Sequence, residues 1–565
     1  MCRPLAQRVC KQYDKLKAMD TLPKNQPNDS GDIASISGSY PQEKTAPAFG
    51  AEKPPTEPPL PPIGEETPVV TPGVENPLAS QLPEMASGPV SPPASEASPF
   101  ASPVTSEPPL PPPPPSTADN PFTIRADVAP TASGGGSNVK RLIAIAILIV
   151  ALLAIGFVAF TVVGKLLTQQ QPVVLQYWGL WENDQVLTPI IEAYQQSHPN
   201  IQIVYSRQSP RQYRETLQAR IGRGEGPDIF RFHNTWVPML REELAPAGKT
   251  GYTPAEFQQT FYPVMSRDLV VGEQVYGVPL MIDGLGLYYN EDLLRSAGVT
   301  PPTTWEEFRQ AASQLTVKDE TNRIVTAGAA LGAANNIEHF SDILAVMMMQ
   351  NGVDLNNPIS VEAEQALSFY RFFADPPANT WDETLDNSIL AFASGKVAFI
   401  FAPSWQVFTI RDLNPQLKFQ VIPIPQLPGT NVAWASYWVE GVSQKSEHQE
   451  EAWEFLKYLS SKEAMIQLYT EEAKLRSFGE PYSRVDLAQT ISNDPFVGAY
   501  VRQAPIAQSF FLASRTFDNG INDRMIKYLE DAVNSQAQGV SPAGALGTMT
   551  QGFTQVMQSF TAPTR

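Results

Sequence analysis

The sequence of 565 residues has very little cysteine and few charged side chains, which make up 17% of the chain. Both cysteines, Cys2 and Cys10, lie at the N-terminus. The rest of the chain therefore has no disulfide and must be held by its own hydrophobic core. Lys and Arg number 40 against 58 Asp and Glu, which gives a formal net charge of −18. Because phosphate binding needs a basic surface, this balance argues against a nucleic-acid partner.

Motifs for enzymatic chemistry and for cofactors are also missing. The chain has no GxxxxGK[ST] phosphate loop, no GxSxG nucleophile elbow and no HExxH zinc helix. Its four histidines, His198, His233, His339 and His448, share no spacing that is typical of metal ligands. The sequence therefore predicts no cofactor, no metal and no catalytic residue.

One uncharged stretch of 23 residues begins at Leu142 and ends at Gly164. A helix rises about 1.5 Å per residue, so this length spans a hydrocarbon core of roughly 30 Å. The alternative is a buried helix of a soluble domain, but such helices are rarely apolar on every face for so long. We therefore predict a single transmembrane helix over 140–167.

The charges beside this stretch predict its orientation. Lys140 and Arg141 precede it, whereas Lys165 is the only cation close behind it. The positive-inside rule then places the N-terminus in the cytoplasm and the C-terminal part outside the cell.

The region before the stretch, residues 1–139, holds more than half of the 54 prolines. Such a composition cannot bury enough apolar surface to offset chain entropy, so we predict a disordered cytoplasmic tail. The tail is either a spacer or a docking segment for a proline-reading domain. Met19 is as plausible a translation start as Met1.

Strands and helices are predicted to alternate from residue 173 onward, which indicates an α/β fold with a parallel sheet and helices on both faces. In order, the predicted segments are a strand over 173–178, a helix that begins with Thr188 as N-cap and Pro189 in its first turn, a strand over 201–205, a helix over 213–221 and a strand over 228–232. Further on we expect a capping box over 304–307, strands over 397–401 and 419–424, and helices over 452–459 and 523–533. About 390 residues exceed one core, so two lobes are expected.

Aromatic and polar side chains gather where the predicted strands end. In open α/β sheets, ligands lie outside the carboxyl ends of the strands. A Trp ring covers the apolar C–H face of a sugar, while carboxylates and amides bind its hydroxyl groups. Each of these Trp residues alone could instead pack in the core, but the set as a whole favours a carbohydrate site. The candidate ligand-binding residues are Trp181, Glu182, Asn234, Trp236, Asp283, Trp405, Trp434, Tyr437 and Trp438.

Four segments resemble the extracellular solute-binding proteins of family 1, the sugar receptors of ABC importers that are similar to maltose-binding protein. The segments are GEGPDIFRFHNTW (224–236), YGVPLMIDGLGLYYNEDLLRSAGVTPPTTWEEF (276–308), AFASGKVAFIFAPSW (391–405) and QEEAWEFLKYLSSKEA (449–464). The resemblance covers nearly all of the chain from residue 173 to residue 560. The first 170 residues have no counterpart in the family, and the family's usual lipid-anchored cysteine is absent.

The resemblance implies a two-lobed solute-binding domain over 172–565, with ligand held between the lobes. Lobe 1 would comprise about 172–282 and 437–493, and lobe 2 about 283–436 and 494–565. Trp405 stands where a family Trp stacks on sugar, and Asp283 where an acidic residue binds sugar. Asn234 falls near a polar sugar contact, and Trp181 and Glu182 fall where the first loop touches ligand. The partners implied are a small-molecule ligand and an ABC permease, and we expect the binding domain to be monomeric.

The sequence thus predicts a membrane-anchored, extracellular receptor of an ABC importer that binds a sugar or oligosaccharide without covalent chemistry. Two alternatives stay open. In the first, the domain is the ligand-binding part of a sensor. In the second, the chain is a glycosidase, for which Asp283 and Glu182 would be the carboxylate pair.

Overall fold

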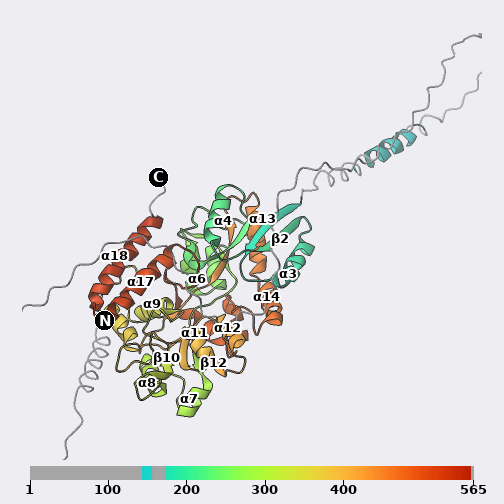
Figure 1. Ribbon diagram of the computed structural model, residues 1–565. Coiled ribbons are helices and arrows are strands. Elements are labelled where there is room, and N and C mark those ends of the chain that lie inside the picture. The colour runs from blue at the N-terminus through green and yellow to red at the C-terminus, as the bar shows by residue number, and fades with distance from the viewer. Residues whose placement is uncertain (1–140, 142, 155–156, 158–171, 562–565) are drawn as a thin grey trace, which may run out of the picture. The chain divides into compact units, whose positions relative to one another are not determined.

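The structure is a computed structural model that describes residue 141, residues 143–154, residue 157 and residues 172–561 (Figure 1). The predicted disordered tail over 1–139 lies outside the described residues, as does most of the second half of the predicted transmembrane helix.

Residues 143–154 form a helix whose apolar side chains are exposed. Ile147 and Leu153, for example, both have more than half of their surface open. No helix within the described ranges is both long enough and apolar enough to cross a membrane.

The first sheet has the strand order β2-β1-β3-β14-β4, and β7 pairs with β14. β1 runs parallel to β2 and β3, whereas β14 is antiparallel to β3. The predicted alternation of strands and helices in this region is confirmed. The strands are β1 (Val173–Gly179), β2 (Ile201–Arg207), β3 (Ile229–His233), β4 (Leu244–Ala245), β7 (Val278–Pro279) and β14 (Trp438–Ser443).

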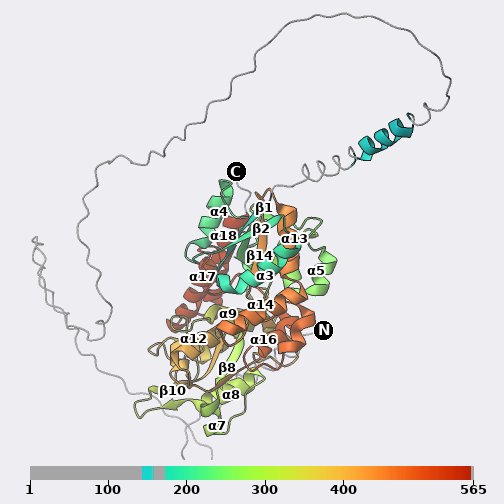
Figure 2. The ribbon, with the colours of Figure 1, turned by 90° about the vertical axis from the view of Figure 1, so that its right-hand side faces the viewer.

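Helices from two segments that lie far apart in the sequence surround this sheet. α13 packs on β14, and α3 packs on β2 and on α14, so residues almost 300 positions apart lie side by side (Figure 2). The helices are α3 (Asp184–Ser197), α4 (Tyr213–Gly222), η1 (Asn234–Trp236), α5 (Pro254–Thr260), α6 (Pro263–Leu269), α13 (Gln449–Leu459), α14 (Lys462–Leu475), η2 (Val485–Leu487) and α15 (Ala488–Ile491). A short hairpin joins β5 (Val270–Val271) and β6 (Gln274–Val275).

The start of α3 differs from the prediction. Thr188 and Pro189 lie inside the helix, and the N-cap is Asn183, whose side chain accepts a hydrogen bond from the backbone N–H of Gln185. Thr188 donates its hydroxyl to the carbonyl of Asp184 at 2.8 Å. Pro189 is the sixth residue of the helix, so its missing N–H removes one hydrogen bond of the helix. In the predicted first turn, that N–H would have had no partner in the helix. The prediction that the helix begins at Thr188 is therefore wrong.

The second sheet has the order β12-β8-β11-β10-β9, with β10 parallel and β8 antiparallel to β11. The predicted capping box is confirmed, because Thr304 and Glu307 each accept a backbone N–H of the other at the start of α8. The strands are β8 (Gly286–Asn290), β9 (Val317–Lys318), β10 (Ile324–Ala329), β11 (Val397–Ala402) and β12 (Phe419–Ile422).

A further group of helices packs around the second sheet. α17 and α18 lie side by side and contact α10 (Figures 1 and 2). The helices are α7 (Glu291–Ala297), α8 (Trp305–Leu315), α9 (Phe340–Gln350), α10 (Val361–Phe372), α11 (Ser388–Ala393), α12 (Gln406–Leu413), α16 (Gly498–Gln503), η3 (Ala504–Ile506), α17 (Ile521–Ala537) and α18 (Pro542–Thr561).

The chain crosses between the two sheets at neighbouring points. Gly284 forms a bridge with Ala435, and Ser436 donates its N–H to the carbonyl of Asp283 at 3.0 Å. A Cβ at position 284 would lie 1.9 Å from the carbonyl oxygen of Trp434, so this approach requires glycine. β13 (Ala433–Trp434) and β15 (Ala507–Gln508) pair in parallel beside the same point.

Candidate functional site

The nine tryptophans differ sharply in exposure, and this decides which of them can stack on a ligand. Trp181 and Trp405 are exposed, with 38% and 37% of their surface open. Trp178 and Trp438 are half-buried. The other five are buried: Trp236, Trp305, Trp381, Trp434 and Trp453. Of the predicted site residues, Trp181, Trp405 and Trp438 therefore offer ring surface, whereas Trp236 and Trp434 do not.

In each sheet, the edge at which the parallel strands end lies beside the crossings. In the first sheet, Trp438 begins β14 and pairs with His233, the last residue of β3, and Trp181 follows the end of β1. In the second sheet, Ala402 ends β11 and pairs with Gly286, the first residue after the crossing. Trp405 follows three residues later. The exposed rings therefore stand beside the carboxyl ends of strands in two different sheets.

The rings at the first sheet support one another. Trp438 lies edge-to-face with Trp181 and with Trp236, with both pairs of ring centroids 5.5 Å apart. Its ring also meets that of His233 at 5.2 Å. Edge-to-face pairs of this kind stabilise by about 0.5–1.5 kcal/mol beyond area burial. Buried Trp236 thus fixes Trp438, which in turn fixes the exposed ring of Trp181.

Trp405 at the second sheet rests on a buried histidine. The rings of Trp405 and His339 are 5.8 Å apart and nearly perpendicular. His339 lies 2.8 Å from the hydroxyl of Ser514 and 3.2 Å from the amide of Gln406. Burial, with a smaller effect of the Arg515 charge, lowers the pKa of His339 to about 3. The support of Trp405 is therefore neutral at physiological pH.

Asp283 is buried beside the crossing, with 5% of its surface exposed. Its Oδ1 accepts the backbone N–H groups of Gly284 at 2.8 Å and Ser404 at 3.0 Å, and its Oδ2 accepts the Ser404 hydroxyl at 2.8 Å. The carboxylate therefore clamps the residue immediately before Trp405. Burial raises the pKa of Asp283 to about 7 despite these hydrogen bonds.

This raised pKa predicts how stability depends on pH. Between the ordinary value of 3.8 and about 7, folded Asp283 holds a proton that the unfolded chain releases. The group's contribution therefore favours folding at low pH and is lost as the pH rises, by about 1.4 kcal/mol per pH unit. As the pH rises from 5 to 7, we expect the melting temperature of the wild type to fall relative to that of Asp283→Asn. Parallel pH profiles of the two proteins would contradict this.

Glu182, next to Trp181, belongs to a buried ion network. Arg231 donates from Nη1 to Glu182 and from Nε to Glu440 at 2.7 Å, and all three side chains are buried. Burial opposes ionisation of Glu182, but the Arg231 charge outweighs it and lowers the pKa of Glu182. Because Arg231 occupies this carboxylate and Ser404 occupies that of Asp283, neither is free to serve as a glycosidase acid or nucleophile.

Asn234 and Tyr437 are held by a carboxylate that the sequence analysis missed. Asp268 accepts the amide of Asn234 at 2.8 Å and the hydroxyl of Tyr437 at 2.7 Å. The backbone N–H of Tyr437 in turn donates to the side-chain oxygen Oδ1 of Asn234 at 3.2 Å. Buried Trp434 likewise donates its indole N–H to Asp342 at 2.7 Å. Asp268 is partly exposed, whereas the other four side chains are buried. All five are paired within the protein, and they fix the crossing on which the exposed rings stand.

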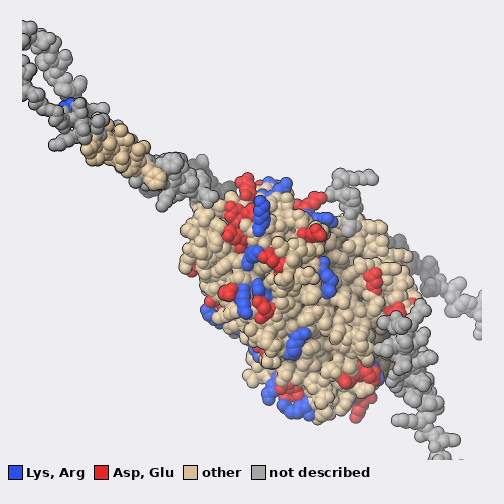
Figure 3. Space-filling model, turned by 180° about the vertical axis from the view of Figure 1, so that it is seen from behind, with Lys and Arg blue, Asp and Glu red and all other residues tan. Residues whose placement is uncertain are grey.

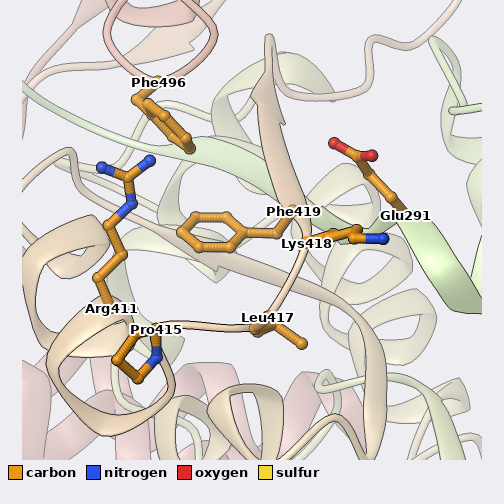
Figure 4. Close-up of a pocket in the computed structure, with 7 residues that line it drawn as sticks. All are labelled: Glu291, Arg411, Pro415, Leu417, Lys418, Phe419 and Phe496. Atoms are coloured by element: carbon orange, nitrogen blue, oxygen red, sulfur yellow. The ribbon is translucent and has the colours of Figure 1, made fainter.

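A pocket of about 400 Å³ lies at the other edge of the second sheet (Figure 4). Phe419 lines it and pairs with Asn290, the last residue of β8. Gly286, at the start of β8 beside the crossing, lies about 13 Å along the strand from Asn290. The guanidinium of Arg411 points at the ring of Phe496, 4.3 Å from its centroid (Figure 4). This pocket is therefore separate from the exposed tryptophans.

The family model of the bacterial extracellular solute-binding proteins matches residues 179–466. The chain belongs to this family. The matched region contains every candidate site residue, from Trp181 to Trp438.

Several known proteins are similar to this solute-binding protein. A multiple sugar-binding protein of Streptococcus mutans is 22% identical over 326 residues, which cover 54% of this chain and 74% of the relative. The cyclic alpha-maltosyl-1,6-maltose binding protein of Arthrobacter globiformis is 20% identical with a TM-score of 0.56, and the match covers 69% of this chain and 100% of that one. The sugar-binding protein MalE of Xanthomonas citri is 19% identical with a TM-score of 0.55, over 68% of this chain and 98% of that one. The two structures show that the fold is shared.

In this solute-binding protein, the residues that support the rings could not be found from local sequence patterns. Asp268, His339 and Asp342 carry no local motif, and their partners lie up to 241 residues away. The segment around Ser514 was missed as well, although it contacts His339. Only the spatial arrangement brings these groups to the crossing.

Proposed function

We propose that this solute-binding protein is the membrane-anchored, extracellular receptor of an ABC importer and that it binds a sugar or oligosaccharide in a cleft between two lobes. Lobe 1 (about 172–282 and 437–493) would hold the first sheet, and lobe 2 (about 283–436 and 494–565) the second. The ligand class is supported by relatives that are binding proteins for multiple sugars or for maltodextrins.

The observation that carries the proposal is the placement of the two exposed tryptophans. Trp181 and Trp405 come from different sheets and stand at the edges that adjoin the crossings. Hinge closure about such crossings is one of the common ways in which proteins grip a ligand. Closure would bring the rings toward opposite faces of a sugar, with Trp438 beside Trp181.

The buried candidates have a different role in this proposal. Glu182, Asn234, Asp283, Trp434 and Tyr437 hold the crossing and the Trp-bearing loops in place through the hydrogen bonds described above. Trp236 supports Trp438 from beneath. We propose that ligand contacts come chiefly from the three accessible rings.

The surface charge does not argue against a neutral ligand. On the face shown in Figure 3, Lys and Arg side chains lie among Asp and Glu, and wide areas carry no charged side chain. The chain as a whole is acidic, with a net charge of −18, but an uncharged sugar is not repelled by such a field.

Titration of the intrinsic tryptophan fluorescence with a panel of di- to tetrasaccharides, maltotetraose included, tests the binding function. Because Trp181 and Trp405 are exposed, a bound sugar that covers their rings should shift the emission to shorter wavelength, and the shift should saturate as sugar is added. The double variant Trp181→Phe/Trp405→Phe should lose the shift. A panel in which no sugar gives a saturable signal would contradict the proposal.

We also propose that the uncharged stretch from Leu142 to Gly164 anchors the protein in the membrane. The helix at 143–154, with its exposed apolar side chains, supports this. Lys140 and Arg141 on its N-terminal side favour a cytoplasmic tail and an external binding domain. Protease added to intact cells should therefore degrade the domain from residue 172 onward. Digestion of the tail alone would show the opposite orientation.

A further inference from the structure

Three carboxylates from distant parts of the sequence meet beneath the loop that carries Trp181. One carboxylate oxygen each from Glu182, Glu472 and Glu480 lie within 4.8 Å of one another. Glu182 belongs to the loop after β1, Glu472 to α14 and Glu480 to the segment that follows α14. Glu182 and Glu472 are buried, and Glu480 is mostly covered.

The arginines around this cluster compensate only part of its charge. Arg231 pairs with Glu182 and Glu440, and Arg476 donates from Nη2 to Glu472 at 3.0 Å and to Glu480 at 2.8 Å. Four carboxylates thus face two guanidinium groups. Two formal negative charges remain in a region from which water is largely excluded, where uncompensated charge is strongly disfavoured.

The deepest of the three carboxylates has an oxygen without a partner. Glu472 is 3% exposed, and its Oε2 accepts the N–H of Glu480 at 2.7 Å together with Arg476. Its Oε1 is buried and receives no hydrogen bond. A buried acceptor without a protein donor leaves a place that a water, a proton or a cation can fill.

We propose that Glu182, Glu472 and Glu480 bind a calcium ion. Ca²⁺ takes carboxylate oxygens at about 2.3–2.6 Å, so oxygens that share one ion lie no more than roughly 5 Å apart, and the three oxygens here lie within 4.8 Å of one another. Arg231 contacts both oxygens of Glu182, and Arg476 contacts one oxygen each of Glu472 and Glu480. The ion would therefore share these oxygens with the guanidinium groups and would also take the Oε1 of Glu472. Arg231 and Arg476 would orient the ligands from outside, as hydrogen-bonded neighbours of metal ligands commonly do.

Calcium at this place would connect the ligand loop to the crossing. The segment after α14 is bound to the first crossing, because Ile282 donates its N–H to the carbonyl of Pro481 at 2.9 Å and Met281 forms a bridge with Tyr482. The ion would thereby tie Glu182, and the adjacent Trp181, to the crossing. An effect of calcium on sugar affinity rests on the proposed function, whereas calcium binding itself does not.

Calorimetric titration of the full-length protein in detergent with CaCl2, after treatment with a chelator and without sugar, tests the site. We expect saturable binding with a Kd on the order of 10⁻⁴–10⁻³ M, as in extracellular calcium modules, and a higher melting temperature in calcium than in chelator. Glu472→Gln should abolish both responses. The matched control is Glu463→Gln, an exposed side chain on the same helix, which should retain both.

The Gln variant also separates a calcium site from a folding defect. Because it removes a buried charge, Glu472→Gln should melt in chelator no lower than the wild type and yet fail to respond to calcium. Should that variant not fold, Glu480→Gln gives the same comparison. The proposal would be overturned if the wild type showed no saturable calcium response. It would also be overturned if Glu472→Gln bound calcium as tightly as the wild type. Stability that rises on acidification with no effect of calcium would show that a proton completes the site instead.

Discussion

Replacement of Trp405 by Ala is expected to weaken the binding of the carried sugar at least tenfold while leaving the fold largely intact. An aromatic contact contributes about 0.5–1.5 kcal/mol beyond the area that it buries, and about 1.4 kcal/mol corresponds to a factor of ten in affinity. The ring is 37% exposed and meets the ring of His339 on one side, so its removal should leave no closed cavity. Calorimetric affinity and melting without ligand should be measured on the same preparations.

Two controls separate a binding role of Trp405 from a structural one. Leu413→Ala removes an exposed apolar side chain at the other end of α12 and should leave affinity unchanged. Trp434→Ala removes a buried ring and should cost about 3–5 kcal/mol of stability, as core truncations of this size do. If Trp405→Ala lost as much stability as Trp434→Ala and still bound normally, Trp405 would be a core residue.

Replacement of Arg231 by Met is expected to destabilise the protein by about 3–5 kcal/mol, because it leaves Glu182 and Glu440 as buried, unpaired carboxylates. All three groups are buried, and both ion pairs depend on this one guanidinium. Methionine retains much of the aliphatic volume of Arg231, so the loss reports mainly on charge. The free energy of unfolding from urea denaturation measures the effect.

The matched control for Arg231 is Arg223→Met. Arg223 pairs with Glu225 at 3.1 Å, but its side chain is 56% exposed, and such pairs contribute roughly 0–1 kcal/mol. Adding Glu182→Gln and Glu440→Gln to Arg231→Met should restore part of the lost stability. A loss for Arg231→Met no larger than that for Arg223→Met would show that the buried network is unimportant for folding.

Local patterns in the sequence predicted much of the fold. The strand that begins at residue 173 and the helix begun by Thr304 and Glu307 both depend on neighbouring residues. The alternation of strands and helices also predicted the parallel pairs of β1 with β2 and β3, but not the antiparallel strands that make both sheets mixed. The predicted start of α3 was wrong because Asn183 and Thr188 are both acceptable N-caps. In the structure Asn183 is the cap, and the Thr188 hydroxyl instead bonds the carbonyl of Asp184 within the helix.

The candidate site could be predicted only in part. The positions of the tryptophans after strands were visible in the sequence, but their exposure was not, since it depends on what packs over each ring. Asp283 was expected to bind hydroxyl groups, and in the structure its oxygens accept from Ser404, 121 residues away. Pairings over such separations are set by the crossing of two sheets, and a single sequence does not encode them locally.

A crystal structure of the domain with a bound oligosaccharide tests the central claim most directly. The proposed function predicts sugar between the two sheets, with one face against Trp405 and another against Trp181 and Trp438, and with the sheets closer together than without ligand. A sugar bound away from these rings, for example in the pocket beside Phe419, would contradict it.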